Sequence, residues 1–275
     1  RRSDRHRPID RPSGHRPYPR GDRRVRVHIE SLEHHVTLIT VDNPPRYNAM
    51  TREMMSDLAR AWDELDQSDC RCVVLTGAGE KAFSSGADVS GDLSAEAEKA
   101  STINRALLKT STFSKPVIAA VNGVCAGGGV ELLLATDIRI AAEHARFGLP
   151  EVKWSIYPFG GATIKLIEQI GYVHAMDLIL TGRLVNAAFA ERIGLVNRVV
   201  AADQVLTDAL ETAETIAKNS PSAVQAVKRQ ISATITEHAL SREDLDQALG
   251  DEVRASPHFA EGVAAFREKR DPDYG

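Results

Sequence analysis

Apolar and polar residues alternate along two segments near the start of the ordered-looking part of the chain, Val-Arg-Val-His-Ile from Val25 and Val-Thr-Leu-Ile-Thr-Val from Val36. Such alternation is typical of strands with one buried face. His34-His35 lies between the two segments and is expected at an exposed strand edge or turn. The pattern therefore predicts a β-hairpin that ends at Asn43-Pro44-Pro45.

A helical period follows the hairpin. Thr51 is a good N-cap residue, and apolar residues then recur at helical spacing through to Asp66, at Met54, Leu58, Trp62 and Leu65. The pattern next alternates between buried strands (residues 70–77, 115–121 and 138–142) and helical or glycine-rich segments, including a helix at 96–109. This order predicts an α/β fold with mainly parallel strands and right-handed crossovers.

The remainder of the chain is predicted to be largely helical. Glycines at 171, 182 and 194 end three short apolar segments, and Asn186 is a predicted cap of the third. A short strand, Leu-Val-Asn-Arg-Val-Val, follows. Helices are then expected at 203–218, 221–236, 241–255 and 257–269, with Ser241 and Asp244 as a capping pair for the third.

Composition narrows the class of protein. The 275 residues carry a net charge of −4 and three cysteines, an odd number that suits a reduced compartment. The nine histidines have no metal-ligand spacing, so no metal is expected. No apolar run is long enough to span a bilayer and no signal-peptide pattern opens the chain, which predicts a protein of the cytoplasm or an organelle matrix without membrane contact.

Charge is distributed unevenly. Residues 1–26 contain ten arginines and three aspartates, a charge of +7, so the remainder carries −11. Residues 1–24 are rich in Pro and Gly and poor in aliphatic residues, which predicts a disordered basic arm. A solvated tail is favoured over a nucleic-acid contact or a targeting segment, because interleaved aromatic residues and an amphipathic period are absent from the arm.

The candidate site is the segment Val121 to Glu151. A strand breaks at Asn122-Gly123, and three glycines lead into an apolar helix that carries Glu131 in its first turn. Glu151 follows on a second turn. Glycines let a ligand approach the backbone, and the N–H groups at a helix start suit a developing negative charge. A glycine run before a helix is also common as a plain connection, so the pattern alone leaves both interpretations open.

Many short motifs decide between them. The chain from about Val25 to Tyr274 resembles the crotonase, or enoyl-CoA hydratase/isomerase, superfamily. The likeness rests on the order and spacing of segments that include residues 43–50 (Asn-Pro-Pro-Arg-Tyr-Asn-Ala-Met), 82–88 (Ala-Phe-Ser-Ser-Gly-Ala-Asp), 115–123, 127–131 (Gly-Gly-Gly-x-Glu), 136–141, 147–151, 181–183, 194–197 and 266–270.

The resemblance implies a spiral of ββα units with two roughly perpendicular sheets at 25–200, and a helical trimerisation region at 201–275. It implies a homotrimer or a dimer of trimers that acts on an acyl-CoA thioester, with coenzyme A as part of the substrate and no separate cofactor. Carried over residue by residue, the oxyanion hole falls on the backbone N–H groups of Ala87 and Gly128. Hydratases of this superfamily use two glutamates, and Glu131 and Glu151 occupy both positions.

The same resemblance implies that Arg46, the loop with Ala87, Asp88 and Val89, and Lys269 contact coenzyme A, with Gly128 beside the thioester. Phe159 departs from the superfamily, which commonly has glycine there, and is expected to narrow the acyl pocket or displace the water. Enoyl-CoA hydration is the predicted activity. The alternatives are an enoyl-CoA isomerase or another acyl-CoA lyase of this fold and, from the basic arm, a crotonase-like RNA-binding protein, although nucleic acid is not expected as a partner because the body is acidic.

Overall fold

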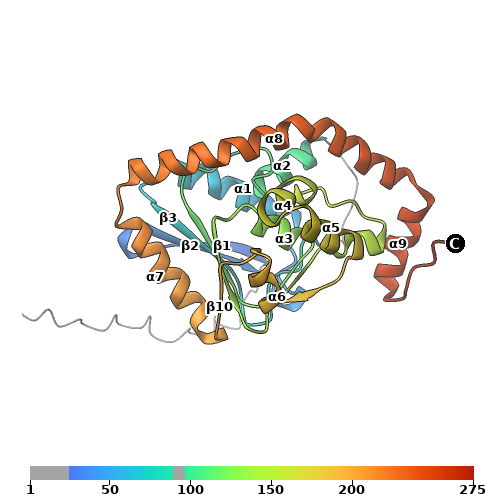
Figure 1. Cartoon of the computed structure of the whole chain (residues 1–275), viewed down its shortest axis with the longest axis horizontal. Coiled ribbons are helices and arrows are strands. Elements are labelled where there is room, and N and C mark those ends of the chain that lie inside the picture. The colour runs from blue at the N-terminus through green and yellow to red at the C-terminus, as the bar shows by residue number, and fades with distance from the viewer. Residues whose placement is uncertain (1–24, 89–96) are drawn as a thin grey trace, which may run out of the picture.

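The computed structural model describes residues 25–88 and 97–275 (Figure 1). The predicted basic arm, residues 1–24, and Val89 lie outside the described residues. Within the described part of the chain, no helix combines the length and the apolarity that a membrane span requires. The three cysteines are buried and unpaired in disulfides, as small core residues.

The larger sheet has the strand order β1-β2-β3-β5-β7-β10. β1 is antiparallel to β2, which confirms the predicted hairpin, and the other neighbours are parallel. Every residue of β3 and β5 is buried, because helices or the second sheet cover both faces. The strands are β1 (Arg26–Ser31), β2 (Val36–Asp42), β3 (Cys72–Gly77), β5 (Val117–Val121), β7 (Ile138–Ala142) and β10 (Arg198–Val200).

A second sheet has the order β4-β6-β8-β9, in which β4, β6 and β8 are parallel and β9 is antiparallel to β8. Each of β3, β5 and β7 in the larger sheet is followed along the chain by one strand of this second sheet and then by a helix. The predicted ββα repeat is therefore confirmed. The strands are β4 (Ala82–Ser84), β6 (Val124–Ala126), β8 (Arg146–Gly148) and β9 (Val185–Asn186).

Local sequence explains where several helices begin. The Thr51 hydroxyl accepts a hydrogen bond from the Met54 N–H, and the Asn186 side chain accepts one from the Phe189 N–H, so both predicted caps are confirmed. The helices before residue 200 are α1 (Arg52–Asp66), α2 (Ala97–Ala106), α3 (Gly128–Leu133), α4 (Ala162–Ile170), α5 (Tyr172–Thr181) and α6 (Ala187–Arg192), with short 3-10 turns η1 (Glu33–His35), η2 (Pro44–Arg46) and η3 (Pro150–Trp154).

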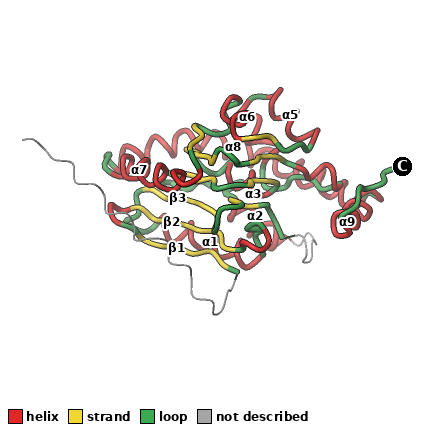
Figure 2. The backbone as a smooth tube through the Cα atoms, turned by 90° about the horizontal axis from the view of Figure 1, so that it is seen from below, coloured by secondary structure: helices red, strands yellow, loops and turns green. Residues whose placement is uncertain are grey.

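The predicted helical C-terminal region is present. After the turn η4 (Ala202–Gln204), α7 (Val205–Ala217) packs on β3, β5 and β7. α8 (Pro221–Ala255) then runs along one side of the whole molecule, and α9 (Pro257–Glu268) lies at one end (Figure 1). Figure 2 shows β1, β2 and β3 next to one another, with α9 and the C-terminus at the opposite end of the molecule.

The division of α8 into two predicted helices was wrong. One continuous helix covers both segments, and Ser241 is not a cap: its hydroxyl donates to the His238 carbonyl oxygen, 2.8 Å away, within the helix. Serine commonly makes this bond to the preceding turn without ending a helix. The buried Ala239 and a hydrogen bond between His238 and Glu168 of α4 hold the middle of α8 against the core.

Candidate active site

Two loops meet where β4 and β6 end. Because these parallel neighbours end at the same edge of the sheet, the Ser84–Asp88 loop lies against the glycine run that opens α3. The approach is so close that a Cβ on Gly129 would overlap the Ser84 carbonyl oxygen, and one on Gly86, where φ is +98°, would lie 2.7 Å from the Gly128 nitrogen. Glycine is therefore required at both positions.

The backbone N–H groups of Ala87 and Gly128 are neighbours in this arrangement. A Cβ built on Gly128 would lie 3.3 Å from the Ala87 nitrogen. The residues around Ala87 are bonded, since Met50 N–H donates to the Gly86 carbonyl (2.7 Å) and Asp88 N–H to the Met50 carbonyl (2.9 Å). Among the described residues, neither the Ala87 nor the Gly128 N–H has a hydrogen-bond acceptor, which leaves two adjacent donors for a ligand oxygen.

Asn48 holds the start of the loop that contains Ala87, a role that the sequence analysis did not assign to it. Its buried side chain accepts from the Asn43 N–H (2.9 Å) and donates to the carbonyl oxygens of Ala78 (3.0 Å) and Ala82 (2.7 Å). The Ser84 hydroxyl donates to the Asn48 carbonyl at 2.9 Å. The φ of Asn48 is +55°, a left-handed conformation that asparagine tolerates well. The available sequence signal for this role was therefore an asparagine at the end of the turn Asn-Pro-Pro-Arg-Tyr-Asn.

Glu131 is buried at the start of α3, 5% exposed. Its Oε1 accepts a hydrogen bond from the Ala162 N–H at 3.4 Å, and a Cβ on Gly160 would overlap its Oε2. Burial raises the pKa of Glu131, and the N–H groups of Ala162 and Gly160 and the charge of Lys109 oppose that rise. The backbone around Gly160 therefore contacts this carboxylate and orients it.

Glu151 lies beside Gly127, the first glycine of the run. A Cβ on Gly127 would lie 3.1 Å from its Oε1, and its buried Oε2 has no hydrogen-bond partner among the described residues. Burial raises the pKa of Glu151, and the nearby charge of Glu131 raises it further, with a weaker opposing backbone hydrogen bond. The structure thus brings the two predicted acids close enough for the charge of Glu131 to act on Glu151, with Glu131 in the first turn of α3 and Glu151 beside Gly127.

The C-terminal helix α9 packs against η3, the turn that carries Glu151. The rings of Trp154 and Phe266 lie 5.2 Å apart in an edge-to-face arrangement. The Tyr274 hydroxyl donates to the Lys153 carbonyl oxygen at 2.8 Å, and a Cβ on Gly262 would overlap the Trp154 carbonyl. α9 therefore packs closely on η3 of its own chain.

The Phe159 ring packs against α8. It lies where a Cβ on Gly250 would be, has the Arg254 guanidinium 4.4 Å from its centroid and meets the Tyr157 ring edge-on at 5.5 Å. Gly160 is the residue of this segment that contacts Glu131. The predicted obstruction of the acids by Phe159 has no support in these contacts, because the ring is engaged by α8.

The predicted coenzyme A contacts are only partly brought together. Arg46 Nη1 lies 3.4 Å from Asp88 Oδ1, and the arginine side chain is exposed beside the Ala87 loop. Lys269 follows α9 with φ of +56°, and its ammonium makes no hydrogen bond or ion pair with the described residues. No cluster of three metal-ligating side chains is found in the described ranges 25–88 and 97–275.

These features define a crotonase-type fold with a two-donor, two-carboxylate site. The model of the enoyl-CoA hydratase/isomerase family matches residues 31–275, and the chain belongs to this family.

Relatives and solved structures agree. The chain is 42% identical over 248 residues to an enoyl-CoA hydratase of Mycobacterium tuberculosis, covering 87% of this chain and 93% of the relative. It is 36% identical to a short-chain-enoyl-CoA hydratase of Clostridium acetobutylicum, covering 88% of this chain and 95% of the relative. A carnitinyl-CoA hydratase of Mycobacterium avium superposes with a TM-score of 0.84 at 36% identity, over 91% of this chain and 98% of that structure.

Proposed function

We propose that this chain is an enoyl-CoA hydratase that adds water across the 2,3 double bond of an acyl-CoA thioester. One observation carries the proposal. Two carboxyl groups whose pKa values burial raises, Glu131 and Glu151, lie next to the glycine run that carries the Gly128 N–H, and this N–H and that of Ala87 are adjacent donors with no acceptor among the described residues. Relatives that are named enoyl-CoA hydratases and share 36–42% of its residues over most of the chain support the same activity.

In this proposal the thioester carbonyl oxygen binds the N–H groups of Ala87 and Gly128, and the support is that these two donors are adjacent. Both donors are fixed before substrate arrives, so they stabilise the negative charge that develops on this oxygen when C3 is attacked. One such preorganised donor is worth about 3 to 4 kcal/mol in comparable sites. This oxyanion stabilisation makes C3 electrophilic and holds the enolate until C2 receives a proton.

The two carboxyl groups then divide the proton transfers. Glu131 takes a proton from water as the water oxygen bonds to C3, and Glu151 delivers its own proton to C2. The site regains its starting state when the proton on Glu131 passes to Glu151, so one water is consumed and no net proton. The surroundings favour this division, because the N–H groups of Gly160 and Ala162 and the charge of Lys109 favour an ionised Glu131, whereas Glu151 Oε2 has no donor among the described residues.

The test is the loss of conjugated-thioester absorbance when crotonyl-CoA and longer 2-enoyl-CoAs meet the purified protein. Glu131→Gln and Glu151→Gln are expected to lower kcat by at least about 10²-fold each, the usual contribution of a positioned acid or base. An enoyl-CoA isomerase needs one acid only. Conversion of 3-enoyl-CoA by Glu131→Gln at the wild-type rate, without hydration by the wild-type chain, would replace the hydratase with an isomerase.

We further propose that Arg46, Asp88, Val89 and Lys269 contact coenzyme A. The support is the position of the exposed Arg46, whose guanidinium lies 3.4 Å from the half-buried Asp88 of the Ala87 loop. Arg46→Ala is expected to raise KM for the thioester and leave kcat unchanged, and the Lys269→Ala variant tests whether the C-terminal residue takes part. Equal kinetics for the shortened substrate crotonyl-pantetheine in wild type and Arg46→Ala would localise the contact to the nucleotide part.

Assembly as a homotrimer or a dimer of trimers is also proposed, with residues 201–275 as the trimerisation region. Its support is the set of apolar side chains that α8 leaves exposed, namely Val227, Ile231, Leu240, Leu245 and Leu249. Light scattering after size exclusion measures the mass directly. The cytoplasm or an organelle matrix remains the predicted compartment, and neither a separate cofactor nor a nucleic-acid partner is expected.

A further inference from the structure

The Asp246 carboxylate on α8 binds both ends of the segment whose backbone contacts Glu131. Asp246 Oδ1 accepts hydrogen bonds from the Tyr157 hydroxyl at 2.6 Å and from the Thr163 hydroxyl at 3.0 Å. The five residues between them, 158–162, include Gly160 and Ala162, whose backbone touches the Glu131 carboxylate. The position of this segment therefore depends on an acid that lies 83 residues after Thr163 and 89 residues after Tyr157.

Asp246 is itself buried, 4% exposed, and needs a countercharge. Its second oxygen, Oδ2, accepts from the Lys109 ammonium at 2.7 Å, and Lys109 is 2% exposed. Glu243 Oε2 lies 2.8 Å from the same ammonium, one turn earlier on α8. A buried ion pair of this kind contributes little net stability, but it fixes geometry because each partner is costly to leave unpaired.

Apolar contacts from the same helix reinforce the arrangement. Phe159, in the middle of the segment, packs on Gly250, and Arg254 lies over its ring. Asp246, Gly250 and Arg254 are spaced four residues apart on α8, so one face of the helix holds residues 157–163.

We propose that Asp246, charge-balanced by Lys109, is a positioning residue for Glu131: it holds the segment 157–163 so that Gly160 and Ala162 orient the carboxylate that takes the proton from water. The inference rests on the hydratase function proposed above. Asp246 does not touch the substrate in this scheme and acts through the segment. The ionisable groups whose charges act on Glu131, or on which Glu131 acts, are five: Lys109, Glu151, Tyr157, Lys165 and Asp246.

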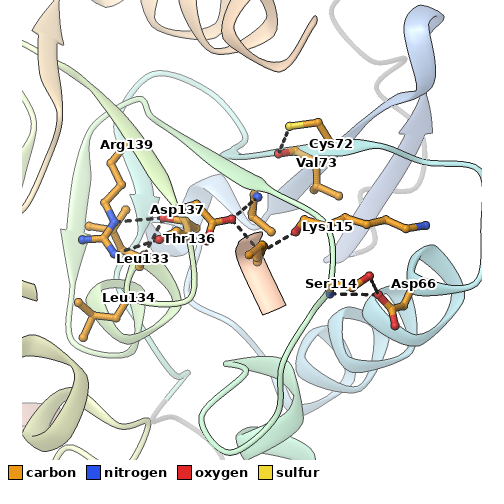
Figure 3. Close-up of polar contacts among 12 residues, drawn as sticks. Asp66, Cys72, Val73, Ser114, Lys115, Leu133, Leu134, Thr136, Asp137 and Arg139 are labelled. Atoms are coloured by element: carbon orange, nitrogen blue, oxygen red, sulfur yellow. Dashed lines mark hydrogen bonds and ion pairs between the residues drawn. The ribbon is translucent and has the colours of Figure 1, made fainter. Parts of the chain in front are cut away.

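The structure supplies a matched control on the same helix. The Lys228 ammonium, near the start of α8, binds the Lys115 carbonyl oxygen at 2.6 Å and Asp137 Oδ2 at 2.7 Å. Figure 3 shows the Asp137 carboxylate near the backbone of Lys115, whose side chain extends away from Asp137. Lys228→Met thus removes an ion pair that anchors α8 without altering the residues that touch segment 157–163.

The experiment compares Asp246→Ala, Asp246→Asn, Tyr157→Phe and Lys228→Met with wild type. Asp246→Ala is expected to lower kcat for crotonyl-CoA about 10²-fold, the loss that a misplacement of about 1 Å brings, with little change in KM. Asp246→Asn keeps an oxygen for the two hydroxyls but turns an amide NH2 toward the Lys109 ammonium, so it should lose clearly less kcat than Asp246→Ala. Tyr157→Phe removes one hydroxyl and should cost up to about tenfold, the worth of one hydrogen bond. Lys228→Met should match wild-type kcat.

Amide hydrogen exchange gives a second readout that needs no catalysis. A peptide covering residues 157–163 should exchange faster in Asp246→Ala than in wild type or Lys228→Met, since the Ala162 N–H loses its partner when the segment shifts. Wild-type kcat in Asp246→Ala, an equal loss in Asp246→Asn, or an equal loss in Lys228→Met would overturn the proposal. An inactive wild type with faster exchange in Asp246→Ala would overturn the hydratase function and leave the positioning contact in place.

Discussion

Glu151→Gln should make the protein less active. It should also reduce the loss of stability that the wild type shows between low and neutral pH. Burial and the charge of Glu131 raise the pKa of Glu151 from 4.5 to about 8, and its Oε2 lacks a partner among the described residues. The folded state thus binds a proton that the unfolded chain releases above pH 4.5. Stability that this group contributes is complete at low pH and is lost as the pH rises toward about 8.

The expected size follows from the linkage. Each pH unit inside this window costs about 1.4 kcal/mol per carboxyl group. Between pH 5 and pH 7 the free energy of unfolding of the wild type should therefore fall by about 2 to 3 kcal/mol more than that of Glu151→Gln. A constant cost of burying the glutamine amide cancels in this comparison, because only the change with pH is used.

Urea denaturation at pH 5, 6 and 7 and one protein concentration measures this difference through tryptophan fluorescence. Glu261→Gln is the matched control, because Arg270 and the Asp273 N–H hold the pKa of the exposed Glu261 low, at about 2, outside the tested range. Its curve should run parallel to wild type. Parallel curves for Glu151→Gln as well would show that Glu151 is ionised in the folded protein, and the assignment of Glu151 as proton donor would fail.

Three further substitutions test the site and its support. Gly129→Ala places a Cβ on the Ser84 carbonyl oxygen, so crotonyl-CoA hydration should fall by at least about 10²-fold, and wild-type turnover would contradict the required close approach. Asn48→Ala leaves two buried carbonyls and one N–H without a partner and should cost about 2 to 4 kcal/mol in urea denaturation; a loss below 1 kcal/mol would refute its central role. Thr51→Ala should cost about 1 kcal/mol by the same measurement, with turnover unchanged, and an unchanged midpoint would show that the cap contributes nothing.

The sequence by itself determined the order of elements. Period-2 and period-3.6 patterns, with Thr51 and Asn186 as caps, predicted the hairpin, the buried strands and most helices, because these signals come from residues close together in the chain. The glycine loops and the two acids were also visible in the sequence. Gly86 and Gly129 stand there because a Cβ at either position would overlap the backbone of the neighbouring loop. Glu131 stands in the first turn of α3, and Glu151 Oε1 lies beside Gly127, close enough for the charge of Glu131 to act on it.

Only the tertiary structure decided which distant residues support the site. Nothing local distinguishes Asp246 from the other charged residues of its helix, yet the fold buries it between Lys109 and two hydroxyls. The continuity of α8 and the direction of Phe159 were likewise set by packing, through Ala239 against the core and Gly250 under the ring. Hydrogen bonds and contacts between residues a hundred positions apart leave no periodic trace in the sequence, because each partner alone fits many environments.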